Sequence, residues 1–379
     1  MKIKEFRGIN NVTDRTRLAT GELTAATNVD VGARGNLYTR PARTRIATGR
    51  AGSVRKWNGE VLALLDNNLV ALSESGTVLR TIYDTLGYTR VWYEELPDGR
   101  MAFSNGLING LISPGGVAVP WGIPTPVDTG SGVAGPTRYQ ITYVRNSDGR
   151  EGPPAYSPDR IDTTQSIVGL PVLAGHTINV YFAPYGEQAF YAGSTTTDTF
   201  TQTAPQLGVQ YLGTGLSAPP VGTQLTVWRS RVLIADGKVL WATRPMQPEL
   251  CDMTADFIQM PDRITLVHGT NSGVFVGTDK DVHFLAGETF GALSSNQIIN
   301  GPATLGSLVP IDASRLKPEA QPKGPLNAAL CIVNGAITML TDSGSVVPLT
   351  AETYKRTLTE VYATTRVRNG FVQYIAAPV

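Results

Sequence analysis

Histidine is the side chain best suited to general acid–base chemistry near neutral pH, and the sequence contains three histidines. His176 is expected in a turn, His268 at the end of an apolar strand, and His283 inside a strand. None of them stands at a spacing typical of a metal site, such as H-x-x-x-H or H-E-x-x-H. We therefore interpret all three as structural or surface residues.

Carboxylates and thiols do not form a recognisable reactive site either. Asp279 and Asp281 stand close together, but without the EF-hand loop pattern they are interpreted as the solvated tip of a hairpin. Cys251 and Cys331 each stand alone in apolar surroundings, as expected of buried, reduced thiols made in a reducing cytoplasm. We expect no cofactor, no metal site and no enzymatic activity.

One glycine-rich segment has the spacing of a phosphate-binding loop. Gly130–Gly135 fits G-x-G-x-x-G, which in a dinucleotide site follows a strand and opens a helix. Here Pro124, Pro126 and Pro136 surround the segment, and a strand is expected to follow it. We interpret the segment as a flexible linker between domains.

The positive charges are concentrated near the N-terminus. The first 56 residues carry 12 Lys and Arg against 4 Asp and Glu, an excess of 8, although the whole chain has a net charge of only +1. Such a segment either contacts DNA or an acidic neighbouring subunit, or consists of exposed strand and loop positions. The near-zero net charge gives no general electrostatic argument for a nucleic-acid partner.

The elements that would position these residues are β-hairpins. Apolar runs flank turn residues near positions 67, 105, 236, 279, 334 and 369, and Asn-Gly or Asp-Gly supplies the positive φ of a type I′ turn at several of them. Helical periodicity is sparse, with short helical turns expected only near Pro248–Met253 and Ala351–Arg356. The 40 Gly and 25 Pro residues also suit many short strands joined by tight turns.

The spacing of the hairpin turns indicates a repeat with one insertion. Consecutive spacings are 38, 131, 43, 55 and 35 residues, and four of them lie near the roughly 40–50 residues of a propeller blade. We predict an all-β chain, a β-propeller of about six blades. An inserted immunoglobulin- or fibronectin-III-like sandwich would explain the long interval. The expected divisions are 1–120 (N-terminal arm and first blades), 121–221 (inserted sandwich) and 222–379 (remaining blades).

The sequence contains neither a classical export signal nor a membrane span. Met1–Gly8 is charged and lacks an apolar stretch, so it is no signal peptide. The longest apolar run, Leu326–Leu340, is interrupted by Asn334-Gly335 and is too short to cross a bilayer. We expect a protein without a membrane anchor that is not exported by a classical route.

Several segments resemble the tail nozzle, or tail tubular, proteins of short-tailed bacteriophages. The resemblance covers roughly residues 1–60 and 225–290, and the insert more loosely. The segments that carry it are Phe6–Val12, Asn28–Val31, Leu37–Pro41, Trp228–Gly237, Leu240–Ala242, Pro248–Leu250 and Ile258–Leu285.

This resemblance implies a non-enzymatic virion protein that forms a hexameric ring. Such a ring lies below the portal and adaptor rings, surrounds the channel for genomic DNA without sequence-specific binding, and is often found near tail fibres or spikes. The family contributes no catalytic residues. The expected subunit or adaptor contacts are Arg7, Asn10, Asn11, Arg15 and Arg17 in the arm, and Arg315, Lys317 and Lys323 in a Pro-rich stretch from Pro310 to Pro325 that is equally well explained as a blade connection.

Two other functions remain open at this stage. A propeller-type glycan-binding or glycan-depolymerising tail component would require paired acids around the central channel, whereas Asp84, Glu94, Glu95 and Asp98 are scattered. Alternatively, the region Tyr139–Pro220 acts as an adhesion module that binds a neighbouring fibre or a host glycan.

Overall fold

The structure is a computed structural model, and its regular elements are almost all β-strands. It describes residues 6–27, 29–31, 36–40, 45, 48–162, 166–184, 188–202, 208–213, 215–312, 314, 327–368 and 371–379. Within these ranges the helical elements are two 3₁₀ turns, η1 (Arg15–Arg17) and η2 (Phe290–Ala292). No helix formed by these residues is both long and apolar enough to span a membrane.

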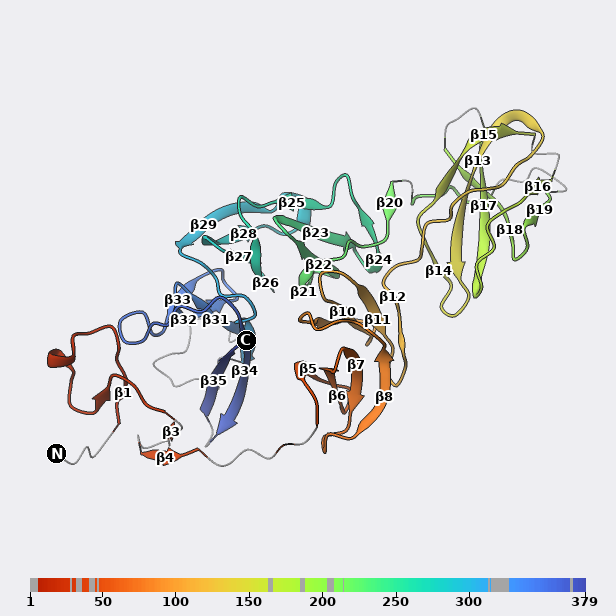
Figure 1. The fold of residues 1–379 in the computed structure, drawn as a ribbon. Coiled ribbons are helices and arrows are strands. Elements are labelled where there is room, and N and C mark those ends of the chain that lie inside the picture. The colour runs from red at the N-terminus through yellow and green to blue at the C-terminus, as the bar shows by residue number, and fades with distance from the viewer. Residues whose placement is uncertain are drawn as a thin grey trace.

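Five antiparallel sheets follow one another around a common centre (Figure 1). In four of these sheets, strands that are consecutive in the chain lie side by side. The first consists of β5 (Ala51–Trp57), β6 (Glu60–Leu65), β7 (Asn68–Leu72) and β8 (Val78–Tyr83), and the second of β9 (Trp92–Glu95), β10 (Met101–Ser104), β11 (Asn109–Ile112) and β12 (Ala118–Pro120). The third contains β20 (Leu216–Ser217), β21 (Thr223–Trp228), β22 (Arg231–Asp236), β23 (Val239–Arg244), β24 (Gln247–Asp252) and β25 (Phe257–Gln259). This third sheet has the order β20-β24-β23-β22-β21, with β25 paired to β23. The fourth consists of β26 (Ile264–Thr270), β27 (Gly273–Thr278), β28 (Asp281–Ala286) and β29 (Ser294–Asn300), and the fifth of β30 (Val309–Asp312), β31 (Asn327–Val333), β32 (Ala336–Thr341) and β33 (Val346–Pro348).

A sixth, two-stranded sheet at the C-terminus lies beside the fifth. It pairs β34 (Val361–Arg368) with β35 (Phe371–Pro378), and the Val361 amide donates to the Leu305 carbonyl over 3.0 Å. The Tyr374 hydroxyl donates to the carbonyl of Ser307, which precedes the fifth sheet. The chain is therefore a β-propeller, as predicted, and five blades plus this hairpin are consistent with the expected number of about six.

The hairpin turns connect the two middle strands of the blades. Asn334 and Gly335, with φ of 50° and 75°, form the β31–β32 turn, and Asp66 and Asn67, with φ of 46° and 75°, form the β6–β7 turn. These paired positive values match the twist of two-residue hairpins. The expected turn at Asn369-Gly370 lies outside the described residues, but Arg368 pairs with Phe371 on its two sides.

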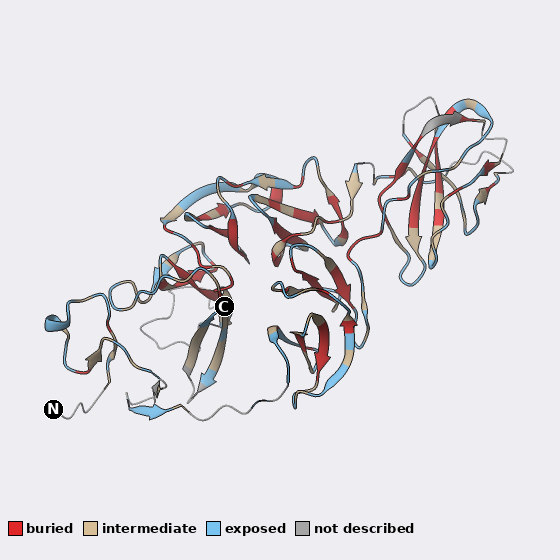
Figure 2. Cartoon of the chain, in the orientation of Figure 1, coloured by how far each residue is buried: buried red, intermediate tan, exposed pale blue. Residues whose placement is uncertain are grey.

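The middle strands form the core between neighbouring blades. Leu69–Leu72 on β7 and all of β27 are buried, because these strands are covered on both faces. Figure 2 shows this burial along the middle strands, whereas the outer strands β8 and β29 are largely exposed. Continuous apolar runs of this length are typical of strands buried on both sides.

The segment between β12 and β20 forms a unit with its own core. Its main sheet consists of β13 (Ala134–Arg145), β14 (Arg150–Glu151), β15 (Ala155–Ile161), β17 (His176–Pro184) and β18 (Phe190–Thr195), and β16 (Ile167–Val168) pairs with β19 (Thr199–Phe200). Ile141, Val180 and Phe200 belong to one buried cluster within this unit. The unit projects from the propeller in Figure 1. Its immunoglobulin or fibronectin type, and the domain limits at 121 and 221, remain predictions.

Two local expectations were wrong. Pro248–Met253 is mostly strand β24 rather than a helical turn, because Cys251 pairs with Thr243 and Ser217. Gly130–Gly135 is not a flexible linker. Its Ser131 exchanges backbone hydrogen bonds with Val168, and a Cβ atom on Gly135 would lie 2.3 Å from the Asp162 nitrogen. The glycines are required for close packing against the inserted unit.

The N-terminal arm consists of short strands outside the blades. β1 (Gly8–Ile9) pairs in parallel with β2 (Glu22–Leu23), and β3 (Val29–Val31) pairs with β4 (Leu37–Thr39).

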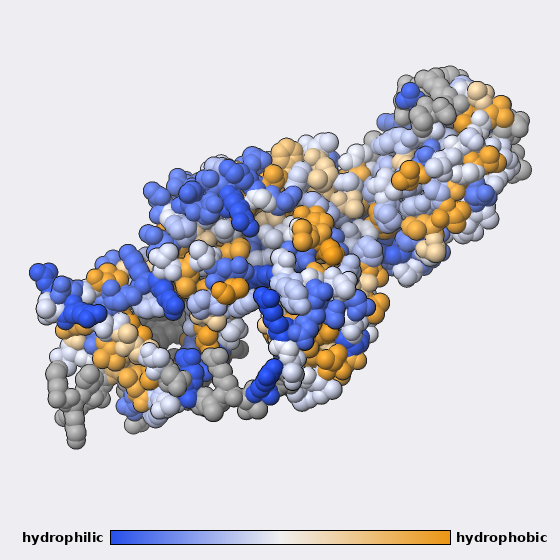
Figure 3. Space-filling model, in the orientation of Figure 1, coloured by the Kyte–Doolittle hydropathy of each residue, from blue (hydrophilic) through white to orange (hydrophobic). Residues whose placement is uncertain are grey.

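On the face seen in Figure 3, hydrophilic residues gather over the region of the fourth blade, while hydrophobic patches are spread over the inserted unit.

Candidate functional site

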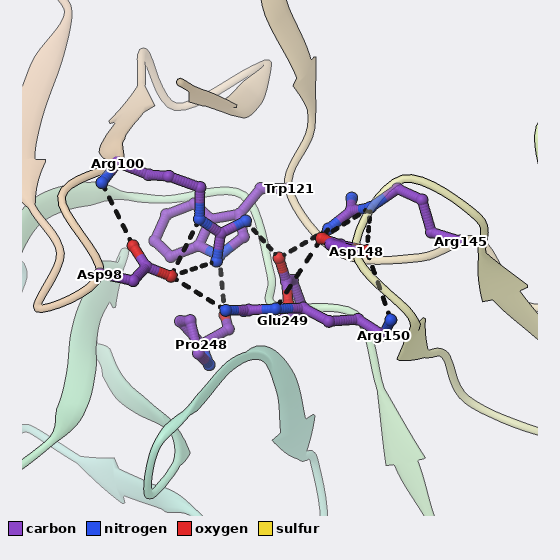
Figure 4. Close-up of polar contacts among 8 residues, drawn as sticks. All are labelled: Asp98, Arg100, Trp121, Arg145, Asp148, Arg150, Pro248 and Glu249. Atoms are coloured by element: carbon purple, nitrogen blue, oxygen red, sulfur yellow. Dashed lines mark hydrogen bonds and ion pairs between the residues drawn. The ribbon is translucent and has the colours of Figure 1, made fainter. Parts of the chain in front are cut away.

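The carboxylate of Glu249 is the buried centre of an ion cluster between the propeller and the inserted unit (Figure 4). Arg100 donates to Oε1 of Glu249 over 2.6 Å and Arg145 donates to the same oxygen over 2.9 Å, while Arg150 donates to Oε2 over 2.6 Å. The Glu249 side chain is only 4% exposed. Because a buried charge is costly without partners, this carboxylate depends on its three guanidinium groups.

Two further carboxylates balance the cluster. Asp98 accepts from Arg100 over 2.7 Å and from Arg150 over 3.0 Å, and Asp148 accepts from Arg145 over 2.7 Å. Burial by itself raises the pKa of both aspartates, but hydrogen bonds from Arg100 and Arg145 and the nearby positive charge bring both pKa values below their usual range. Three arginines thus face three carboxylates, and the cluster has no net charge.

The members of the cluster come from three distant parts of the chain. Asp98 and Arg100 lie between β9 and β10, Arg145 and Arg150 lie at the β13–β14 hairpin, and Glu249 lies on β24. The cluster therefore joins the second blade, the inserted unit and the third blade.

Neutral contacts surround the same joint. The indole nitrogen of Trp121 donates to the Pro248 carbonyl over 2.7 Å, and this tryptophan is 3% exposed. At Gly122, a Cβ atom would lie 2.7 Å from the Ala218 Cβ, so the two connecting segments of the insert touch each other. Since all charges in the cluster are paired, the arrangement suits rigid attachment rather than proton transfer or ligand exchange.

A second region of interest is a cavity of about 950 Å³ near the propeller centre. It is lined by residues of β5, β9, β21 and β26 and by Tyr362 on β34. Glu94 on β9 lies in its wall, where Oε1 accepts from the Val227 amide over 2.7 Å. Burial raises the pKa of Glu94 to about 7, although the Val227 hydrogen bond and Arg55 oppose the shift.

Arg90 links blades across this cavity. Its guanidinium carbon lies 4.2 Å from the ring centroid of Trp92 and 4.4 Å from that of Tyr362. It also donates to the Val361 carbonyl over 2.5 Å. These cation–π and hydrogen-bond contacts hold the C-terminal hairpin to the second blade.

Of the acids considered for a glycosidase, the structure places Glu94 in the cavity wall. Glu95 is exposed, Asp98 belongs to the Glu249 cluster, and Asp84 lies in the turn after β8. No second carboxylate faces Glu94 among the described residues that line this cavity. A glycosidase needs two carboxyl groups on either side of the glycosidic bond.

The three histidines have different surroundings. His176 lies 3.1 Å from the Ala174 carbonyl, and burial lowers the pKa of His268 to about 4. His283 on β28 contacts Asp281 over 3.0 Å and Ser295 on β29 over 3.1 Å. Asp, His and Ser side chains also form the triads of hydrolases. Here, however, Asp281, His283 and Ser295 come from two paired strands, and their contacts are explained by the attachment of β29 to β28.

The expected arm residues have two different environments. Asn10 is 5% exposed, and its Oδ1 accepts from the Thr13 amide over 3.0 Å. Asn11 holds the arm to the C-terminal part of the chain, since its side chain donates to the Lys355 carbonyl and accepts from the Lys355 amide. Arg7, Arg15 and Arg17 are exposed.

The remaining expected contacts, Arg315, Lys317 and Lys323, lie outside the described residues. Cys251 and Cys331 are buried and free, as predicted, and burial raises the pKa of each thiol to about 12.

The Glu249 cluster was not predicted from the sequence, because its members are separated by up to 151 positions and carry no motif. The local signal was the position of Asp148 between Arg145 and Arg150.

Comparisons with known proteins identify no family for this chain. No family model and no curated protein matches the sequence. Among solved structures, a streptogramin B lyase is 11% identical with a TM-score of 0.34, covering 82% of this chain and 86% of that chain. Virginiamycin B lyase from Staphylococcus aureus is 11% identical with a TM-score of 0.33, covering 86% and 91%.

A third structure, AztD from Citrobacter koseri, is 9% identical with a TM-score of 0.32, covering 87% of this chain and 81% of that chain. Two of these three proteins are enzymes by name. Likeness at this level carries no argument on activity, and the blades themselves define the fold.

Proposed function

We propose that this chain is a non-enzymatic structural subunit of a phage particle, a tail nozzle that forms a ring continuing the DNA channel below the portal and adaptor. The observation that carries the proposal is the Glu249 cluster, in which a carboxylate that is 4% exposed binds three arginines from two separate units. A ring wall under the pressure of packaged DNA requires stiff subunits, and this joint resists movement of the inserted unit. The resemblance of residues 1–60 and 225–290 to nozzle proteins supports the same role.

The charge distribution also supports a channel wall. The net charge of +1 provides little general attraction for phosphates, so DNA would pass without being held. The exposed Arg7, Arg15 and Arg17 are then available for an acidic neighbouring subunit or the adaptor ring. In this proposal the virion holds six copies, near which fibres or spikes attach.

The test is to assemble particles in cells where an amber codon stops synthesis of this chain. We expect heads that package DNA but lose it, and tails that lack the ring below the adaptor. A suppressor that restores the full chain is the control and should restore the ring. Particles that keep their DNA and infectivity without the chain would contradict the proposal.

A second candidate function is a propeller enzyme with Glu94 as its acid–base group. The specific observation is the pKa of about 7 for a carboxyl group in the wall of a large central cavity. A carboxyl group with this pKa exchanges protons efficiently near neutral pH.

Purified protein incubated with capsule and lipopolysaccharide substrates separates the two functions. An enzyme would lose turnover in Glu94→Gln and keep it in Glu95→Gln, a matched change at the exposed neighbouring position. The structural role predicts no turnover in the parent chain.

A further inference from the structure

The main sheet of the inserted unit has a second face outside its main core, on which Tyr181, Ala189 and Tyr211 form a small buried cluster. Tyr139, Ile141 and Tyr143 on β13 point into the core. Because side chains alternate along a strand, Gln140 points to the opposite face. There it lies between its cross-strand partners, Tyr156 on β15 and Tyr181 on β17.

A cavity of about 490 Å³ lies on this face. The polar and aromatic residues that line it include Arg138, Gln140, Tyr156, Gln188 and Gln210. Tyr156 is 55% exposed, a high value for an aromatic side chain on the face of a sheet. The cavity therefore presents one accessible ring among several hydrogen-bonding groups.

The buried amide of Gln140 points to a ligand. This side chain is only 4% exposed, and its Nε2 has no hydrogen-bond partner among the described residues. A buried donor without a partner is costly, and most such groups in folded proteins are satisfied. A ligand that accepts a hydrogen bond in the cavity would satisfy it.

We propose that this face binds a carbohydrate chain. A sugar ring presents a C–H face that packs on an aromatic ring and a rim of hydroxyls that both donate and accept hydrogen bonds. Tyr156 supplies the ring, and the amides of Gln140, Gln188 and Gln210 supply paired donors and acceptors. Among the described residues that line the cavity none is a carboxylate and one is Arg138, so the glycan is neutral or anionic rather than cationic.

A protein partner fits this face less well. Leu212, at 80% exposure, is the large exposed apolar side chain among the lining residues, and the other exposed groups are amides, Arg138 and Tyr156. The central part of a protein interface is usually more apolar. The proposal does not depend on the nozzle role, since a chain that binds no glycan can still form the ring.

The test uses the full chain on a printed array of bacterial lipopolysaccharides and capsular polysaccharides, followed by titration of the glycan that binds best. We expect Tyr156→Ala to weaken binding about tenfold or more, because the stacking surface is lost. Tyr88→Ala is the matched control, since Tyr88 is 57% exposed and lies on the propeller. It should bind as the parent does.

Gln140→Leu separates a ligand-binding role from a structural one. Removing an unpartnered buried amide should leave the melting temperature unchanged or higher, while glycan affinity falls about tenfold. The proposal is overturned if no arrayed glycan binds the parent, or if both variants bind as tightly as the parent. It is also overturned if Tyr156→Ala leaves glycan binding intact but removes another protein from assembled particles, because the face would then dock a protein.

Discussion

At the scale of single residues, the structure depends on charges that are buried in pairs. Glu249 with its three arginines differs from surface pairs such as Lys56 with Glu74, in which both side chains are 68% exposed. Desolvated charges depend on every partner, whereas solvent screens exposed pairs. The two environments predict very different responses to the loss of one carboxylate.

Glu249→Gln should lower the free energy of unfolding by about 2 kcal/mol, because it leaves three partly buried guanidinium groups with two carboxylates that solvent partly screens. Urea unfolding measures this value. Glu74→Gln is the control, expected to leave stability almost unchanged, because solvent screens this exposed pair. Equal effects of the two changes would mean that the cluster is not a tight joint.

Glu94 predicts a specific pH dependence of stability. The pKa of Glu94 is about 7 in the folded chain, above its ordinary value of 4.5. Between these two pH values the folded chain therefore keeps a proton on Glu94 that the unfolded chain has released. Stability from this group is present below pH 4.5 and is lost as the pH rises through about 7. His268, whose pKa is lowered to about 4, has the opposite effect, since stability falls as the pH drops below 6.5.

Glu94→Gln should therefore be more stable than the parent at pH 8 by on the order of 2 kcal/mol, a value reduced from the full shift because the side chain is half-buried. At pH 4 the two should be nearly equal. Thermal melts across this range measure the difference, with Glu95→Gln at the exposed neighbouring position as the control. A constant gap at both pH values would show that Glu94 is not desolvated.

At the scale of strands and turns, positive φ values identify strained positions. The β21–β22 turn uses Arg229 and Ser230 with φ of 46° and 64°, whereas the β5–β6 turn uses Asn58 and Gly59 with φ of 47° and 77°. Ser230→Gly should stabilise the chain by about 0.5–1 kcal/mol, because glycine adopts this conformation without strain. Chemical denaturation is the measurement.

Ser113→Gly provides the matched control for this turn. Ser113 is also an exposed turn residue, but it is not among the positive-φ positions. There glycine only increases the entropy of the unfolded chain, so stability should fall slightly. The account of the turns is wrong if the two substitutions change stability in the same direction.

The hairpin pattern was predictable because turn chemistry is local. Asn334-Gly335 and Asp236-Gly237 mark their turns through residue type alone, and each lies between the middle strands of a blade. The bulges of the inner strands could not be predicted. Gln224, with φ of 51°, interrupts the pairing of β21 without a glycine to mark it. Its conformation is set by tertiary packing rather than by propensity.

The candidate site was less predictable than the fold. Arg100 and Glu249 are 149 positions apart, so their contact depends on how the blades are placed in space. The interpretation of Gly130, Gly132 and Gly135 as part of a flexible linker was wrong for the same reason, since only the packed structure shows the neighbouring atoms that require glycine at these positions. Local sequence patterns identify turns, but they do not identify which distant residues contact one another in the fold.

At the scale of the whole molecule, we expect a rigid subunit that assembles into a ring. The propeller and the inserted unit are joined by the ion cluster around the buried Glu249, and the arm is attached to the C-terminal segment through Asn11 and Lys355. The exposed arm cations then lie outside the blades, where a neighbouring subunit can reach them.

Electron cryomicroscopy of assembled tail particles tests this claim most directly. The account predicts six copies of the chain arranged around an axial hole below the adaptor ring. A single copy, or copies attached only at the periphery with no axial opening between them, would contradict it.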